Sequence, residues 1–140
     1  MQFCTFYLNG LFFGVEVTEV QEVIRYQEMT RVPLASCFVR GLINLRGQIV
    51  TAVDLRRRFE LPPTQDDRLP LNVVIRDAQG AVSLLVDEIG DVLNVEETDF
   101  EAPPETLQGV AREFIRGAYK LKDRLLLVLD AEKAINFAQA

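Results

Sequence analysis

Short apolar runs, each bounded by turn-forming residues, dominate the chain. Residues 3–8 and 11–17 flank Asn9-Gly10, a dipeptide that accepts positive φ angles and is typical of a tight β-hairpin. The runs predicted to be strands are residues 3–8, 11–17, 20–26, 40–45, 49–53, 71–75, 81–86, 91–95, 114–121 and 125–129. Ten short strands with turn signals close together predict an all-β protein of small barrels or sandwiches.

Two short helices are predicted where an aspartate can accept hydrogen bonds from the first helical turn. Asp54 precedes a helix that ends near Phe59. Asp130 precedes a C-terminal helix that includes Ile135 and Phe137. Each helix is expected directly after a hairpin, which places them after the fifth and tenth strands.

Three segments depart from the alternating pattern. Residues 61–67 have the composition of a linker, and residues 96–109 form an acidic, proline-containing loop. The strand at residues 125–129 is apolar throughout, so we expect it to be covered on both faces.

The chain also repeats itself. Without a gap, the matched residues are Arg40 and Arg116, Gly41 and Gly117, Leu45 and Leu121, Asp54 and Asp130, and upstream the segments 17–23 and 86–92. Self-similarity at a fixed offset indicates a repeated structural unit. We predict one domain over residues 1–140 with internal repeats at 1–65 and 66–140. These are two pseudo-symmetric five-stranded units on a shared hydrophobic core, with exchange of strands between them left open.

The net charge of −6 is unevenly distributed. Residues 1–65 carry 7 arginines and 6 acids, whereas residues 66–140 carry 8 basic and 15 acidic residues. An acidic protein gains nothing from releasing the counterions of phosphate groups, so binding of nucleic acid is disfavoured. The acidic second half instead favours association with a basic surface.

Catalytic motifs are scarce. The chain contains no histidine, which excludes Ser-His, Cys-His and histidine–metal sites. There is no glycine-rich phosphate loop, and the neighbouring carboxylates Asp87-Glu88 and Glu96-Glu97 are expected to be solvated. Arg56-Arg57-Arg58 is interpreted as a solvated helix face, with a phosphate-binding patch as the alternative.

The cysteines and the hydropathy of the chain indicate the cellular compartment. Cys4 and Cys37 are interpreted as buried free thiols in a reducing compartment. No run approaches the ~20 apolar residues that span a membrane, and the chain begins with a strand-like segment rather than a signal peptide. We therefore expect a cytoplasmic protein that does not insert into a membrane.

One charged pair recurs in both repeats. Glu22 interrupts an apolar strand and Arg46 lies in a tight turn, and Asp91 and Lys122 occupy the matched positions. We hypothesise that each pair lies close in space. A surface ion pair is one interpretation, and a pair that orients a partner-binding loop is the other.

The valines near the start of the chain do not follow one alternation. Val15, Val17, Val20 and Val23 do not keep one alternation phase, because the phase changes between Val17 and Val20. Some of these valines are therefore expected to face outward. A contiguous patch of such side chains would mark a protein interface.

The motifs at residues 14–17, 20–23, 41–50 and 53–56 closely resemble the CheW family of bacterial chemotaxis coupling proteins. The turn Asn44-Leu45-Arg46-Gly47 is the most specific of these signals, and the likeness covers nearly the whole chain. The resemblance implies two SH3-like five-stranded β-barrels. It also implies a non-enzymatic adaptor, without cofactor or metal, that joins the cytoplasmic tips of chemoreceptors to a CheA-type histidine kinase at the inner face of the membrane.

The resemblance also implies site residues. The implied receptor contacts are Val20, Glu22, Gly41, Arg46 and Val92. Contacts with the kinase's regulatory domain are implied for Val17 and its neighbour Val15, and a ring contact of the second barrel for Pro104, Glu105 and Thr106. Thr106 stands where the family usually carries an aromatic side chain.

Other functions stay open at this point. The chain is alternatively a CheW-like scaffold of a chemosensory pathway that does not control swimming, with other partners. A third class is a small-molecule-binding barrel or an enzyme, which the absence of histidine and of a phosphate loop disfavours.

Overall fold

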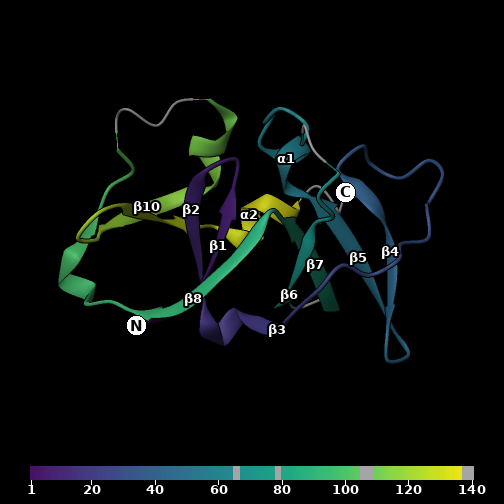
Figure 1. The fold of residues 1–140 in the computed structure, drawn as a ribbon, viewed down its shortest axis with the longest axis horizontal. Coiled ribbons are helices and arrows are strands. Elements are labelled where there is room, and N and C mark those ends of the chain that lie inside the picture. The colour runs from purple at the N-terminus through teal and green to yellow at the C-terminus, as the bar shows by residue number, and fades with distance from the viewer. Residues whose placement is uncertain (65–66, 78–79, 105–108, 137–140) are drawn as a thin grey trace.

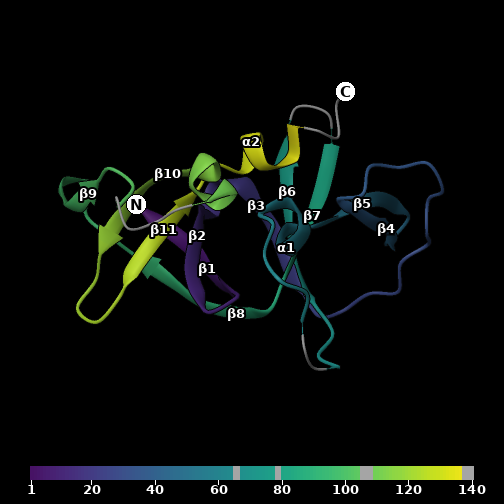
Figure 2. The same cartoon turned by 90° about the horizontal axis from the view of Figure 1, so that it is seen from above.

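In this computed structural model, two β-sheets lie side by side, with short helices at their junction (Figures 1 and 2). The structure describes residues 1–64, 67–77, 80–104 and 109–136. Phe137, predicted to belong to the last helix, lies outside these ranges. The all-β prediction is confirmed. The prediction that both cysteines are buried is wrong, because Cys37 is exposed and Cys4 is only half-buried.

Sheet A contains six strands in the order β8-β1-β2-β11-β10-β9. Their bounds are Gln2–Leu8 for β1, Leu11–Glu16 for β2, Glu88–Asn94 for β8, Phe100–Glu101 for β9, Ile115–Lys120 for β10 and Leu125–Leu129 for β11. Neighbouring strands are antiparallel except β2 and β11, which are parallel.

Sheet B contains five strands in the order β3-β6-β7-β5-β4. Their bounds are Val20–Ile24 for β3, Val39–Leu45 for β4, Gln48–Asp54 for β5, Leu71–Asp77 for β6 and Gly80–Val86 for β7. Here β5 and β7 are the parallel pair. Each sheet therefore takes strands from both halves of the sequence, because β1 and β2 join the late strands and β6 and β7 join the early ones.

The predicted turns and caps form for the expected reasons. Asn9 and Gly10 have φ angles of 53° and 80°, which suits the two-residue turn between β1 and β2. Helix α1 (Leu55–Arg58) begins where Asp54 accepts a hydrogen bond from the backbone of Arg57. Helix α2 (Ala131–Ile135) begins in the same way, with Asp130 accepting from Lys133.

Three short 3-10 turns, η1 (Val17–Glu19), η2 (Glu97–Asp99) and η3 (Val110–Phe114), separate strands in the described ranges. Turn η1 explains why the alternation of the valines breaks after residue 16. The segment predicted as a continuous loop at 96–109 instead contains η2 and the two-residue strand β9. These elements are too short to show a sequence period.

The two sheets share a hydrophobic core. Phe59, which follows α1, stacks on Phe114 with ring centroids 5.2 Å apart and lies 5.7 Å from Phe13 of sheet A. Strand β11 contributes to two clusters, with Leu127 and Leu129 in the shared core and its neighbours in a second cluster within sheet A. The prediction that residues 125–129 are covered on both faces is confirmed from Leu126 onward, since Leu125 is partly exposed.

Neither sheet closes into a barrel through a continuous hydrogen-bond ladder within the described ranges. Strands β3 and β4 remain the edges of sheet B, and β8 and β9 remain the edges of sheet A. The barrels of the sequence-based prediction are therefore open sheets. An ion pair links Glu22 on β3 to Arg46 in the turn after β4, and an isolated bridge joins Thr30, in the segment between these strands, to Leu42 on β4.

Candidate functional site

An ion pair between Glu22 and Arg46 joins the two edges of sheet B. Arg46 stands in the two-residue turn between β4 and β5, with a φ of 51°, and its guanidinium donates to the Glu22 carboxylate on β3. The Arg46 side chain is 69% exposed and that of Glu22 20%. The pair predicted from sequence is thus present, and it lies at the surface.

Hydrogen bonding keeps Glu22 ionised. The bond from Arg46 lowers the pKa of Glu22, partial burial opposes this, and a further hydrogen bond from the side chain of Gln21 lowers it again. At neutral pH Glu22 is therefore ionised, and the Arg46 side chain beside it remains largely accessible to another protein.

Gly41 on β4 allows the segment around Thr30 to pack closely against that strand. Thr30 and Leu42 exchange two backbone hydrogen bonds of 2.8 Å, which lay the segment before β4 onto that strand. A Cβ atom at Gly41 would lie 2.7 Å from the Thr30 carbonyl oxygen. Gly41 is buried, so it acts on the surface through backbone placement rather than by direct contact.

The valines implied as partner contacts differ in exposure. Val92 on β8 is 57% exposed, whereas Val17 and Val20 are half-buried. Val15 on β2 has no exposed surface and lies in the shared core. A direct contact of Val15 with a partner is therefore incompatible with this structure, because alternation along β2 points that side chain inward.

The second charged pair does not form. Among the described residues, no ion pair joins Asp91 to Lys122. The turn after β10 is longer than its counterpart after β4, and its other cation, Arg124, lies over the ring of Phe12 at 4.0 Å. Among the described residues the ion pair of sheet B therefore does not recur in sheet A, where the turn is longer.

Of the three residues implied for the ring contact of the second barrel, the structure describes one. Pro104 is half-buried, and its carbonyl oxygen accepts a hydrogen bond from Arg112. Glu105 and Thr106 lie outside the described residues.

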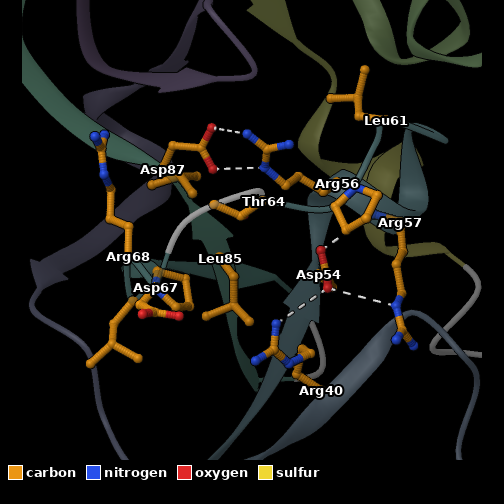
Figure 3. A pocket seen from close by; sticks show the side chains of 14 residues that line it. Arg40, Asp54, Arg56, Arg57, Leu61, Thr64, Asp67, Arg68, Leu85 and Asp87 are labelled. Atoms are coloured by element: carbon orange, nitrogen blue, oxygen red, sulfur yellow. Dashed lines mark hydrogen bonds and ion pairs between the residues drawn. The ribbon is translucent and has the colours of Figure 1, made fainter.

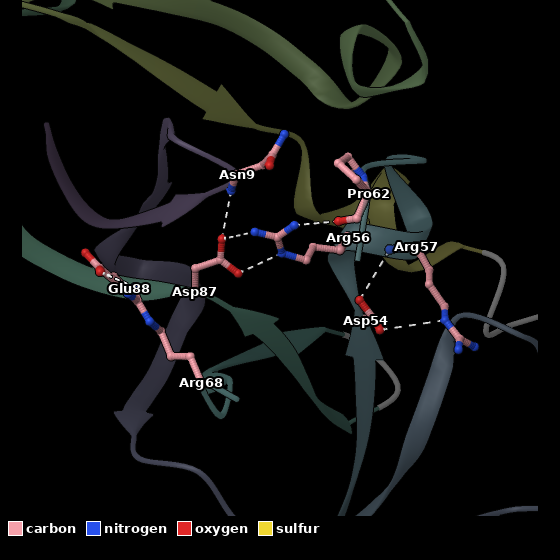
Figure 4. Close-up of polar contacts among 8 residues, drawn as sticks. All are labelled: Asn9, Asp54, Arg56, Arg57, Pro62, Arg68, Asp87 and Glu88. Atoms are coloured by element: carbon pink, nitrogen blue, oxygen red, sulfur yellow. Dashed lines mark hydrogen bonds and ion pairs between the residues drawn. The ribbon is translucent and has the colours of Figure 1, made fainter. Parts of the chain in front are cut away.

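A second polar cluster, which sequence reasoning missed, ties the two sheets together (Figure 4). Arg56 on α1 makes a two-point contact with Asp87, with Nε–Oδ1 and Nη2–Oδ2 distances of 2.9 and 2.6 Å. Asp87 also accepts a hydrogen bond of 2.8 Å from the backbone of Asn9, and Arg56 donates to the carbonyl of Pro62.

This arrangement corrects the interpretation of Arg56 and Asp87 as solvated charges. Their side chains are only 16% and 20% exposed. Burial raises the pKa of Asp87, but the hydrogen bonds from Arg56 and Asn9 and the nearby cations outweigh that effect and hold the pKa below its ordinary value. No spacing rule could have joined residues 31 positions apart on separate elements.

Beside this cluster lies a cavity of about 510 Å³ (Figure 3). The charged side chains that line it are Arg40, Arg56, Arg57, Arg68, Asp54, Asp67 and Asp87. Arg40 and Arg57 both approach Asp54, at 3.5 and 3.9 Å. Arg40 and Arg57 thus share Asp54 while Arg56 pairs with Asp87, which is the arrangement of a structural network rather than of a reactive centre.

Among the residues that the structure describes, no three His, Cys, Asp or Glu side chains lie close enough together to bind a metal ion. The helices that are described are likewise too short or too polar to cross a membrane. The features that stand out among the described residues are surface features: the accessible Glu22–Arg46 ion pair, the exposed Val92 and the open edges of both sheets.

Comparison with known proteins agrees with this picture. The family model described as the CheW-like domain matches residues 2–139. The chain belongs to the CheW family. It is 34% identical over 133 residues to the chemotaxis protein CheW of Bacillus subtilis, covering 94% of this chain and 84% of that protein.

The CheW protein of Klebsiella aerogenes is 31% identical over 135 residues, covering 96% of this chain and 81% of that protein. The crystal structure of the scaffolding protein TtCheW from Thermoanaerobacter tengcongensis superposes with a TM-score of 0.81 at 26% identity, covering 91% and 87% of the two chains. The two-sheet fold and the scaffold or adaptor character of the family are therefore established for this CheW-like chain.

Proposed function

We propose that this chain is a non-enzymatic adaptor that couples the cytoplasmic tips of chemoreceptors to the regulatory domain of a CheA-type histidine kinase. The observation that carries the proposal is the Glu22–Arg46 pair, an accessible charged contact on a CheW-like fold. The protein would work in the cytoplasm and reach the membrane-bound receptor array only through its partners.

The receptor surface would centre on Arg46. Glu22 holds the guanidinium across the sheet edge, and Gly41 allows the neighbouring segment to lie close beneath it. Val20 and Val92 would supply apolar contact. Because Arg46 is held by one carboxylate and remains largely exposed, a receptor carboxylate can share it without breaking the pair.

The kinase contact would include Val17 on η1, which is half-buried and has some surface left for a partner. Pro104 and the adjoining residues Glu105 and Thr106 would form a second contact, from sheet A, that closes mixed rings. Two modest contacts suffice, because simultaneous binding in an array raises the effective concentration of each partner.

Coupling in this scheme requires no chemical step. A rigid two-sheet body that touches receptor and kinase together shifts the kinase between states according to which receptor conformation it binds more tightly. The Arg56–Asp87 cluster supports such rigidity because it ties α1 to the β1–β2 turn and to the β7–β8 junction.

A bridging assay tests the proposal. Receptor tips are immobilised, and retention of the kinase regulatory domain is measured with and without this protein. Wild type is expected to retain the kinase domain, and Arg46→Glu to weaken receptor binding about tenfold, equivalent to ~1.4 kcal/mol. Lys120→Glu, the same charge reversal on sheet A, serves as the matched control.

The charge-swapped double variant Glu22→Arg with Arg46→Glu separates recognition from structure. It restores an ion pair of reversed polarity, so a purely structural role predicts restored coupling. Recognition of Arg46 by the receptor predicts that coupling stays defective while the circular dichroism spectrum and melting temperature match wild type. Wild type that retains no kinase domain would overturn the proposed function.

A further inference from the structure

The segment that connects β3 to β4 presents a leucine to solvent in a strained conformation. Pro33 and Leu34 occupy the centre of a turn in which the backbone N–H of Ala35 faces the carbonyl oxygen of Val32 at 3.4 Å. Leu34 has a φ of +70°. That position of a type II turn ordinarily takes glycine or asparagine, because a larger side chain is disfavoured there.

Burial of the Leu34 side chain does not compensate this strain. The Leu34 side chain is fully exposed, with a relative exposure of 105%, the largest among the exposed large hydrophobic residues. The surrounding segment is nevertheless ordered by contacts. Val39 donates to the Ser36 carbonyl at 2.9 Å, and Arg57 donates to the Cys37 carbonyl at 3.0 Å. A strained, unburied side chain on a held loop points to a role outside the folded chain.

The hollow beside Leu34 is basic. It has a volume of about 440 Å³, and Arg31, Arg40 and Arg57 are the charged residues in its described lining. Arg40 and Arg57 share Asp54, which lies outside that lining, and Arg31 has no ion pair with any described residue. This positive patch contrasts with a chain of net charge −6, so it favours an acidic partner.

The position of this loop separates it from the proposed receptor surface. Arg46 follows the end of β4, whereas Leu34 precedes its start, and a seven-residue strand spans about 20 Å. The loop also lies at the outer end of sheet B, away from sheet A, in both views (Figures 1 and 2). A partner bound here would therefore not compete with a receptor held at Arg46 and Val92.

We propose that the loop at residues 31–37 is a docking element in which Leu34 inserts into an apolar depression of the kinase regulatory domain and the arginines meet carboxylates around it. This inference rests on the proposed function and adds a contact to the one at Val17. Leu34 is the anchor, and Arg31 supplies charge that the fold itself does not use.

The test relies on opposite effects on stability and on binding. Leu34→Asn removes the anchor and suits the left-handed backbone, so its melting temperature should equal or exceed that of wild type. Its affinity for the kinase regulatory domain should fall about tenfold or more. Affinity for the receptor tip should not change. Leu69→Asn, at another exposed loop leucine without a positive φ, is the matched control.

Charge reversal gives an independent arm. Arg31→Glu should weaken kinase binding and reduce its dependence on salt, whereas Lys120→Glu should do neither. Kinase affinity unchanged in both Leu34→Asn and Arg31→Glu, measured alongside wild type that does bind, would overturn this inference alone. Wild type that binds neither kinase domain nor receptor tip would overturn the proposed function as well.

Discussion

Sheets A and B are two versions of one design. Strands β8, β1, β2, β11 and β10 follow one another in sheet A as β3, β6, β7, β5 and β4 do in sheet B. Each sheet contains one parallel pair of strands. In each, a short helix with an aspartate at its N-terminus follows one strand of that pair, α1 after β5 and α2 after β11. Even the ion pairs Arg40–Asp54 and Arg116–Asp130 agree, both at 3.5 Å.

The two sheets differ where the first and last of these five strands face each other, β3 and β4 in sheet B and β8 and β10 in sheet A. We call this place the seam of each sheet. Sheet B is spanned by Glu22 and Arg46, whereas Asp91 and Lys122 of sheet A form no such pair within the described residues. Features that recur in both sheets serve folding, since each sheet needs caps and close approaches. A feature present in only one sheet is free to serve recognition, so we expect the two sheets to be equal in stability and unequal in partner binding.

The largest expected effect concerns the core that joins the sheets. Phe59→Ala should lower the free energy of unfolding by about 3–5 kcal/mol, because the ring is buried in the shared core and packs on Phe13 of sheet A. Urea unfolding followed by circular dichroism and by tyrosine fluorescence should still give one coincident transition. Two separate transitions would show that the sheets fold independently.

The matched glycines come next. Gly41→Ala and Gly117→Ala should each cost about 3 kcal/mol, the upper end for overpacking, because each new methyl group would meet a backbone carbonyl oxygen. At Gly117 the methyl would also meet the ring of Phe100. Thermal unfolding of both variants checks this. A large cost in one sheet alone would break the equivalence.

The stabilisation from the Arg56–Asp87 contact between the sheets should depend on pH. The pKa of Asp87 lies below its ordinary value of 3.8 in the folded state, so its stabilisation is complete above that value and is lost as pH falls toward the folded-state pKa. Asp87→Asn should therefore cost about 2 kcal/mol at pH 7. The difference from wild type should shrink as pH falls below 3.8 in urea titrations, and a difference independent of pH would contradict the assignment.

The helix caps should show the smallest effect. Asp54→Ala and Asp130→Ala should each lower the free energy of unfolding by about 1 kcal/mol, since each removes one backbone cap. Asp54 also faces two arginines and Asp130 one. The Asp54 variant should therefore be slightly less stable in chemical denaturation, and equal stability would assign the cost to the caps alone.

Local chemistry explains what the sequence predicted well. Asn9-Gly10 and Arg46-Gly47 set two turns, and Asp54 and Asp130 start two helices. The apolar run at 125–129 becomes a strand that is buried from Leu126 onward. Each of these depends on residues within a few positions of one another. The length of a segment explains what was missed. Strand β9 contains only Phe100 and Glu101, which is too short to show an alternating pattern in the sequence.

Contacts between distant elements were not predictable in that way. The exchange of hairpins between the halves depends on which sheet edge each hairpin meets, and Arg56 meets Asp87 only after both sheets have formed. Leu34 is a further case, since Pro33 indicates a turn but not the strained residue after it. For the candidate site, the sequence identified Glu22 and Arg46, but the burial of Val15 required the core to be seen.

The most direct test of unequal recognition is the affinity of the receptor tip for Arg46→Glu and Lys122→Glu, measured by isothermal titration calorimetry at neutral pH. The two changes reverse the same charge at matched positions of the two sheets. We expect about a tenfold loss for Arg46→Glu and less than about twofold for Lys122→Glu, with melting temperatures unchanged. Equal losses in both variants, or full affinity in Arg46→Glu, would contradict the assignment of recognition to the seam of sheet B.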